Sequence, residues 1–517
     1  MEPKKEIIRY FLEKGILISK ELAQKLSQED LKTLKEKING KNMLLLDNEV
    51  MEMLKRDPGA EMDWQGVEKL KAGLEKKKNL GAYKEALSSI KTAEKNPENS
   101  QGVEITVSHQ TVPRKIEVQD FVKHLNNRYE AIRNLLLGRQ ELKNSTSINK
   151  LFMKKEKDTV SIIGLVTEKR LSKNGNWMFT IEDPTGTIKT IINKNKPEQF
   201  ETATNTCLDE VVGVVGVFSK DIIFGNSIFY PDVPLTKELK KSPDQTYAIF
   251  ISDLHFGLNV FLQENLERFI KWIRGEIGND GQKAISSKIK YLFIIGDLVE
   301  GVGIYPGQEN DLKIKDIYAQ YEALSVFLKQ IPSSISIIIC PGNHDAMRIA
   351  EPQPPLYMDF AKPLYEMKNV HMVSNPSCIN IHKSKGFPGF DVLMYHGFSF
   401  TYYGDNVESI RLQGGMERPD LIMRFLLQRR HLAPTHTSTL YIPDTGKDPL
   451  VIDKVPDFFV SGHIHRTAVA NYRNVTIINS SCWVSQTDYQ EKVGLKPQPA
   501  RVPIVDLQTR EAKILKF

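Results

Sequence analysis

The chain has 517 residues, of which 26% are charged and 40% hydrophobic, and its formal net charge is +6. That length allows several domains with a large core, and the modest positive charge permits a nucleic-acid partner without requiring one. The four cysteines are scattered with no CxxC pair, which argues against a disulfide framework and a zinc ribbon. Because the sequence shows no secretory leader and no long apolar run, we expect a cytoplasmic protein with no membrane partner.

The first part of the chain is expected to be helical and then polar. Apolar residues recur at helical spacing between residues 4 and 38, which predicts an N-terminal helical module over 1–56. This module is either a docking unit or a helical extension with no partner. Residues 57–115 are rich in Lys, Glu, Asn and Gly, which predicts a polar linker whose charge runs are solvated surface rather than a nucleic-acid patch.

Two further regions follow this linker. Helical periodicity resumes over 116–150, where RYEAIRNLLLGR is expected to pack on the next domain rather than to touch DNA. Residues 151–235 alternate apolar and polar side chains between turn signals, which resembles an OB-fold, a small barrel that commonly binds single strands or partner proteins. The aromatic residues of this domain are expected to serve mostly as barrel core, with stacking on bases as the alternative: Trp177, Phe179, Phe224, Phe229 and Tyr230.

A polar connector, PLTKELKKSPDQ, leads into the last region, residues 246–517, where strands and helices alternate. The β-prone run YAIFI ends by presenting Asp253 and His255, two positions apart, before Gly257. In an open α/β sheet, ligands bind at this end of the strands. Helices are expected over 263–277 and 311–331, so the region predicts an α/β domain whose helices cover its sheets.

Four later apolar runs end in the same way as YAIFI. The polar residues that follow them are Asp297 after YLFII, Asn343, His344 and Asp345 after ISIIIC, His396 after VLMY, and His463 and His465 after FFVS. Each residue alone fits an ordinary role as a cap, a turn residue or a core histidine. Together, carboxylate, amide and imidazole groups suit Mn²⁺, Zn²⁺ or Fe better than Ca²⁺. Seven ligands suit two metals that share a bridging carboxylate, an arrangement that clamps phosphates and activates water.

The motifs D-x-H, GD, GNHD, H and GHxH, in this order, resemble the calcineurin-like metallophosphoesterase superfamily. The sequence around these motifs resembles a narrower family, the small subunits of archaeal family D DNA polymerases. The similar stretches are ISDLHFG, GIYPGQENDLKIKDIYAQYE, PGNHDAMRIAEPQPPLYMDFA, YHGFSF and SSCWVSQTDYQ. The resemblance covers more than half of the chain. It implies a multidomain α/β fold, in which an OB-fold precedes two stacked sheets flanked by helices.

The resemblance also implies a role for each motif residue. One metal would be held by Asp253, His255, Asp297 and His465, and the other by Asp297, Asn343, His396 and His463. The cofactors would be two divalent ions, with Mn²⁺ favoured and Zn²⁺ or Fe as alternatives. His344 would protonate the leaving oxygen, and Asp345 would orient the His344 ring.

The activity implied by the resemblance is a 3′→5′ exonuclease acting on single-stranded or mispaired DNA 3′ ends. It would proofread for a large polymerising subunit, because nothing in this chain resembles a polymerase active site. The alternatives are a free-standing repair nuclease or phosphodiesterase, and an architectural subunit with an idle site. The last residues, AKILKF, are expected to form a strand, with a sliding clamp as the alternative contact.

Overall fold

The computed structural model describes residues 17–18, 45–46, 102–110, 114–487, 490–491 and 494–517. Strands β1 (Leu17–Ile18) and β2 (Leu45–Leu46) pair in parallel in a unit separate from Ser100–Phe517. Both lie in the region expected to be helical, so that expectation is wrong for these four residues, whose backbones pair with each other. The rest of the 1–56 module and most of the 57–115 linker lie outside the described residues.

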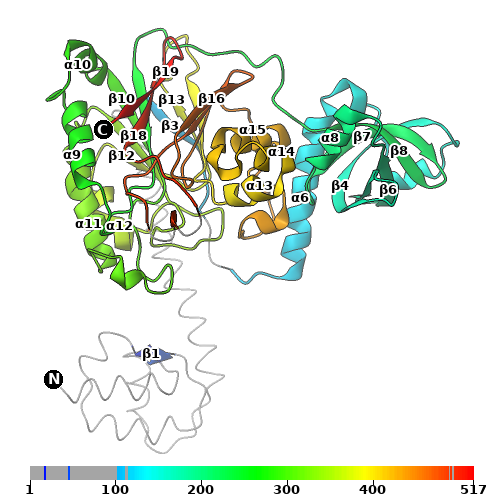
Figure 1. Ribbon diagram of the computed structural model, residues 1–517, viewed down its shortest axis with the longest axis horizontal. Helices are drawn as coiled ribbons and strands as arrows, with labels where there is room; N and C mark the ends of the chain where they lie inside the picture. The colour runs from blue at the N-terminus through cyan, green and yellow to red at the C-terminus, as the bar shows by residue number, and fades with distance from the viewer. Residues whose placement is uncertain (1–16, 19–44, 47–101, 111–113, 488–489, 492–493) are drawn as a thin grey trace, which may run out of the picture. The chain divides into compact units, whose positions relative to one another are not determined.

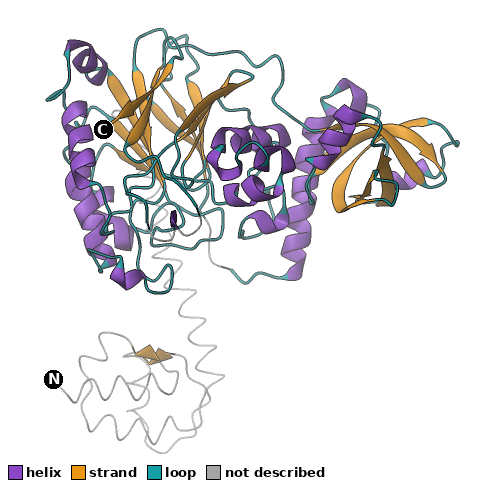
Figure 2. Ribbon diagram, in the orientation of Figure 1, coloured by secondary structure: helices purple, strands orange, loops and turns teal. Residues whose placement is uncertain are grey.

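Two six-stranded sheets form the α/β part of the larger unit (Figure 2). The first sheet has the order β12-β11-β10-β9-β18-β19, in which β9 to β12 run parallel. Its strands are β9 (Tyr247–Ile251), β10 (Ile289–Ile295), β11 (Ser336–Cys340), β12 (Val370–Met372), β18 (Arg501–Asp506) and β19 (Ala512–Lys516). The expectation of a strand in AKILKF is therefore confirmed.

The second sheet has the order β16-β17-β15-β14-β13-β3, with β14, β15 and β17 parallel at its centre. Its strands are β3 (Val103–Ser108), β13 (Ser377–Ile381), β14 (Phe390–Met394), β15 (Phe458–Ser461), β16 (Ala468–Tyr472) and β17 (Val475–Asn479). Strand β3 lies within the expected polar linker, which is a correction to the 57–115 boundary. Its sequence VEITVS favours an extended chain, and its backbone pairs antiparallel with the free edge of β13.

The central strands are apolar on both faces because both faces of each sheet are buried. In β9, Ala248 and Phe250 point between the two sheets, and Ile249 and Ile251 join the core on the helix side. The Phe250 ring stacks on Phe293 of the same sheet with centroids 5.1 Å apart and reaches Phe458 of the other sheet at 6.3 Å.

Helices cover the outer faces of the two sheets, which gives four layers (Figure 1). The first sheet is covered by α9 (Gln263–Ile273), α11 (Ile317–Leu328) and α12 (Met358–Tyr365), with α10 (Asp280–Ser286) beside α9. The second is covered by α13 (Phe400–Asn406), α14 (Glu408–Arg411) and α15 (Pro419–Arg429). Helix α11 begins later than expected because Asp316 caps it, accepting a hydrogen bond from the Ala319 backbone N–H.

A closed barrel precedes these sheets in the chain, with the strand order β4-β5-β6-β8-β7. Its strands and helices are β4 (Thr159–Leu171), β5 (Trp177–Asp183), β6 (Gly186–Ile192), α8 (Pro197–Thr204), β7 (Val211–Ser219) and β8 (Ile222–Phe229), preceded by α7 (Ile148–Leu151). Phe179 lies in the barrel core, as expected, but Phe224 is 48% exposed.

Helix α6 (Val118–Leu137) packs on this barrel, which confirms the expectation for RYEAIRNLLLGR. Tyr129, Ile132 and Leu136 pack against barrel residues, and the Tyr129 hydroxyl donates to the Ile163 carbonyl oxygen. Among the described residues, none of the helices combines the length and the apolarity that a membrane crossing needs.

Two buried ion pairs hold the barrel side of the unit to the α/β part. The Arg128 Nε atom of α6 lies 2.6 Å from Asp448 Oδ2, and His431 Nε2 lies 2.9 Å from the same oxygen. Burial and the Arg128 charge lower the pKa of His431 to about 4, so at neutral pH the positive partner of Asp448 is Arg128. In the second pair, Arg429 Nε of α15 lies 3.2 Å from Glu210 Oε1, just before β7.

We predict that Asp448→Ala destabilises the docking of α6 by about 3–5 kcal/mol, because it leaves the Arg128 guanidinium buried and unpaired. Hydrogen exchange of the α6 amides measures this change directly, as a loss of protection confined to α6 and its neighbours. The matched control is Lys383→Ala, which removes an exposed ion pair with Glu104 and should change stability by about 1 kcal/mol or less. Equal protection of α6 in both variants would contradict the prediction.

Candidate metal centre

Five strand ends of the two sheets bring their polar residues to one place. The turns after β9, β10 and β11 come from the first sheet, and the turns after β14 and β15 come from the second. Parallel strands present their carboxyl ends on the same side, so these turns meet at one rim. Three groups of side chains there have ligand atoms within 4.8 Å of one another: Asp253, His255 and His465; His255, Asp297 and His344; and Asp297, His396 and His463.

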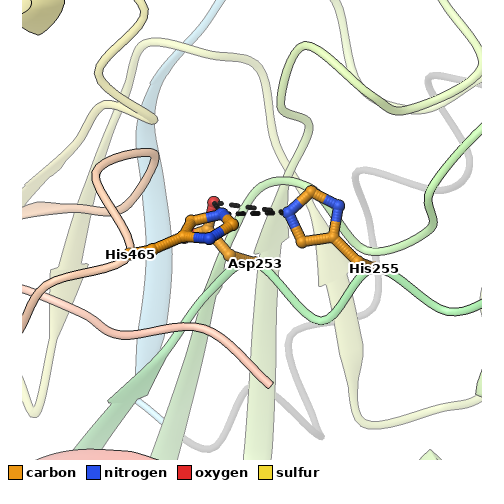
Figure 3. A group of neighbouring side chains, drawn as sticks. All are labelled: Asp253, His255 and His465. Carbon is orange, nitrogen blue, oxygen red and sulfur yellow. Dashed lines mark hydrogen bonds and ion pairs between the residues drawn. The ribbon is translucent and has the colours of Figure 1, made fainter. Parts of the chain in front are cut away.

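The first group is drawn in Figure 3. His255 Nε2 lies 3.1 Å from His465 Nε2, and His465 Nε2 lies 3.4 Å from Asp253 Oδ1. His255 Nδ1 faces the Glu300 carboxylate at 2.8 Å, so Nδ1 carries the hydrogen and the Nε2 lone pair points into the group. The group therefore crowds lone pairs together, an arrangement that suits a cation between them.

The second group lies around Asp297 and His396. His396 Nε2 is 3.3 Å from Asp297 Oδ2 and 3.1 Å from Asn343 Oδ1. His396 Nδ1 donates to the Ile295 backbone oxygen at 2.8 Å, which again leaves a lone pair on Nε2. The His463 ring lies 5.2 Å from the His396 ring, centroid to centroid.

Asp297 joins the two groups. Its Oδ2 atom also lies 3.8 Å from His255 Nε2, so one carboxylate oxygen faces a histidine of each group. Burial alone would raise the pKa of Asp297, but the neighbouring His396 and His344 hold that pKa well below its usual range. Asp297 is therefore ionised, as a shared ligand between two cations would need to be.

The backbone under these side chains adopts the left-handed conformation at five of the seven candidate ligands. The φ angles are 52° at Asp253, 49° at His255, 50° at Asp297, 69° at His463 and 56° at His465. Non-glycine residues rarely take this conformation, and such strain clusters at functional sites, where the surrounding structure maintains it.

Glycines let the turns approach one another closely. A Cβ atom on Gly342 would lie 2.2 Å from Asp297 Oδ1, and one on Gly296 would lie 2.4 Å from His396 Nδ1. At Gly462 the nearest atoms to an added Cβ include Asp253 Oδ2, at 2.7 Å. Any larger residue at these positions would push the ligand groups apart.

His344 lies beside the first group and is fixed by Glu300. Its Nδ1 atom lies 3.0 Å from the Glu300 backbone oxygen and 3.4 Å from Glu300 Oε2. A carbonyl oxygen only accepts, so Nδ1 carries a hydrogen and Nε2 is left to face the site. Burial lowers the pKa of His344, but the Asp297 charge and the Glu300 carboxylate outweigh it and raise that pKa to about 9.

The structure corrects the role expected for Asp345. Its carboxylate accepts hydrogen bonds from the backbone N–H groups of Gly342 and Leu298 and from the Tyr321 hydroxyl, and so it ties the turn together instead of orienting His344. Burial and the Asp297 charge raise the pKa of Asp345 to about 7.

Glu300, which sequence reasoning missed, orients both His255 and His344. The sequence feature that could have pointed to Glu300 is its position in GDLVEG, three residues after Asp297.

We predict that Gly342→Ala destabilises the protein by about 1–3 kcal/mol, because the added methyl group overlaps Asp297 Oδ1 and the Asp297 backbone nitrogen. Thermal unfolding measures the loss. The control is Gly281→Ala in α10, where the nearest atom to the new methyl group is 3.5 Å away and alanine favours the helix. If both variants unfold like the unaltered chain, the close approach of the turns is not required.

Comparisons with known proteins find relatives of this chain. The family of B subunits of DNA polymerases alpha and epsilon matches residues 248–469, a range that contains all five turns. The chain is 39% identical over 401 residues to the DNA polymerase II small subunit of Methanothermobacter thermautotrophicus, an alignment that covers 78% of this chain and 80% of that protein. With the protein of the same name from Pyrococcus furiosus, it is 40% identical over 406 residues, covering 78% of this chain and 64% of the relative.

A third protein of that name, from Archaeoglobus fulgidus, is 38% identical over 387 residues, and the alignment covers 75% of each chain. The chain thus spans somewhat less than two thirds of the length of the Pyrococcus relative and larger shares of the other two. Identity at this level over most of the chain shows common descent of the barrel and the two-sheet part together. The chain belongs to the family of archaeal DNA polymerase II small subunits, the small subunits of family D DNA polymerases.

Proposed function

We propose that this chain is the proofreading subunit of a two-subunit DNA polymerase, a 3′→5′ exonuclease that acts on single-stranded or mispaired DNA 3′ ends. The observation that carries the proposal is the set of seven candidate metal ligands, all present and gathered at one rim, with His344 beside them. In this proposal the large polymerising subunit adds nucleotides and uses this chain as its scaffold.

The fold supports the same proposal. Two stacked sheets with helices outside them fit a calcineurin-like phosphoesterase domain, and the five-stranded closed barrel fits an OB-fold. In open α/β sheets, ligands bind outside the carboxyl ends of the strands, which is where the candidate metal ligands lie.

The ligand atoms fit two divalent ions. Asp253, His255, Asp297 and His465 would hold one ion, and Asp297, Asn343, His396 and His463 would hold the other. Oxygen and imidazole nitrogen ligands without a thiolate suit Mn²⁺, with Zn²⁺ or Fe as alternatives. When bound, such a pair supplies charge stabilisation for the phosphate and an activated water.

The residues of the chain would complete the hydrolysis. The oxygen of water forms a bond to phosphorus, and the bond between phosphorus and the 3′ oxygen of the preceding nucleotide breaks. His344 Nε2 is the group placed to give a proton to that 3′ oxygen, because its Nδ1 hydrogen is held by the Glu300 backbone oxygen. The Glu300 carboxylate, 3.4 Å from Nδ1, stabilises the charged imidazolium before transfer.

We predict that Asn343→Ala, by removing a metal ligand, and His344→Ala, by removing the general acid, each abolish shortening of a 3′-mismatched, 5′-labelled primer-template in Mn²⁺. For His344→Ala the loss expected of a general acid is about 10²–10⁴-fold. The assay follows the unaltered chain and each variant, with and without the large subunit. Asn226→Ala is the control, since Asn226 is exposed on the barrel, where its side-chain oxygen accepts a hydrogen bond from Lys196.

The outcomes of this assay separate the alternatives. Strong activity of the chain alone would favour a free-standing repair nuclease or phosphodiesterase. Activity that depends on the large subunit supports the proofreading role. If the unaltered complex leaves the primer intact, the chain is an architectural subunit with an idle site, and the exonuclease proposal fails.

We also predict that Glu300→Gln lowers kcat by about 10–100-fold with little change in KM, because the carboxylate acts by orienting His255 and His344 and not by touching DNA. Steady-state rates on a single-stranded oligonucleotide measure both constants. Glu309→Gln is a matched control, an exposed glutamate in the same loop. A variant of Glu300 that raises KM alone would show that Glu300 binds substrate instead.

A further inference from the structure

Residues 301–311 form a loop between β10 and α11, and hydrogen bonds hold this loop against the candidate metal centre. Two buried amides hold it: Gln308 donates to Glu300 Oε1 at 3.0 Å and to the Glu300 backbone oxygen at 3.2 Å, and Gln320 pairs with both backbone groups of Gly301. Gln308 and Gln320 are 1% and 0% exposed. Buried amides with all these hydrogen bonds fix the path of the loop.

This 301–311 loop touches His344 directly. A Cβ atom on Gly301 would lie 2.4 Å from the His344 backbone oxygen and 3.0 Å from the Ile304 side chain, so the Gly301 backbone lies against both of them. The Tyr305 hydroxyl donates to Asp311 at 3.1 Å. The Gln308 backbone N–H donates to the Tyr305 backbone oxygen at 3.3 Å, and the Gln308 side chain donates to Glu300, so Gln308 ties Tyr305 to the residue that holds His344.

Three large apolar side chains of the loop reach solvent, alongside the exposed polar residues Glu309, Asn310 and Asp311. Val302, Ile304 and Tyr305 are 49%, 38% and 37% exposed. Apolar patches exposed on the surface of a protein often mark binding sites. The loop therefore presents an exposed aromatic ring on a backbone that Gln308 and Gln320 hold to Glu300 and Gly301, the residues that contact His344.

We propose that Tyr305 is a stacking platform for the base of the nucleotide whose 3′ oxygen leaves, and that it makes the site selective for unpaired strands. The proposal rests on the exonuclease function proposed above. Only one sugar ring separates a base from its own 3′ oxygen, so a nucleotide whose 3′ oxygen meets His344 has its base within reach of this loop. A base that stacks on Tyr305 must leave its own duplex stack, which a mispaired or single-stranded end does at lower cost.

The same geometry argues for a nucleic-acid strand over a protein partner as the occupant. A folded domain seated on Ile304 and Tyr305 would cover His344 and block access of the scissile phosphate. A single strand reaches the surface and the reacting group together. Stacking on aromatic rings is also tolerant of sequence, as an exonuclease that removes any nucleotide requires.

A double-substitution cycle tests the platform. The probe is a 5′-labelled single-stranded oligonucleotide with a phosphorothioate at its last linkage, and its partner carries an abasic residue at the next-to-last position. Fluorescence anisotropy with Mn²⁺ gives the Kd of each oligonucleotide for the full chain. With the unaltered chain, removal of the base should weaken binding about tenfold. Tyr305→Leu should weaken binding of the intact oligonucleotide by the same factor and bind the abasic one no worse.

Two further variants make the result specific. Tyr305→Phe keeps the ring and loses the hydroxyl contact with Asp311, so it should retain the tenfold preference for the intact oligonucleotide. Phe224→Leu changes an exposed aromatic residue on the barrel and should also retain it. A general loss of structure would weaken both oligonucleotides equally, and the cycle would then show no coupling between residue and base.

Opposite results would overturn the platform. Equal affinity of the unaltered chain for the two oligonucleotides, or a Tyr305→Leu variant that still prefers the intact one, excludes stacking at Tyr305. Loss of the preference in Phe224→Leu would place the platform on the barrel. The exonuclease proposal is checked separately, by cleavage of the ordinary phosphodiester oligonucleotide by the complex with the large subunit, so the two can fail independently.

Discussion

Mutual repulsion among the ligand groups is the constraint on which the rest of the structure depends. Two carboxylates, an amide oxygen and four imidazoles converge within a few ångströms, with lone pairs of His255 and His396 directed inward. Each carboxylate attracts the imidazoles beside it, but the two carboxylates repel each other and so do the protonated imidazoles, and a cation between the lone pairs would relieve that repulsion. The fold holds them together through left-handed turns, glycines in close contact and a layer of fixed hydrogen bonds to Glu300, Ile295 and Gln490.

Packing of the two-sheet sandwich stabilises the close arrangement of the ligand groups. Each central strand is buried on both faces, so its register is fixed by packing and its end cannot slide. Burial of these strands against both neighbouring layers offsets the strain at the turns. The ligand arrangement is thus a property of the whole core, and single turns taken out of that core would not adopt it.

Sequence reasoning located the strand ends because each combines an apolar run, a glycine and a polar residue within a few positions. It could not find the role of Glu300, since the contacts with His255 and His344 join three separate turns and leave no local pattern. It assigned Asp345 to His344 by adjacency, whereas the carboxylate turns back to Gly342 and Leu298. Strand β3 was missed because a short edge strand in a polar region is decided by its partner β13 and not by its own composition.

Strand β3 has a consequence for how the chain is connected. The backbone contributes to the second sheet first, then leaves to build α6 and the whole barrel, and returns to begin the first sheet at β9. In topological terms the barrel is an insertion into the two-sheet domain, anchored by a covalent crossing at each end. An insertion with two tethers has less freedom to move than a domain at the end of a chain, so the position of the barrel relative to the two sheets is restricted.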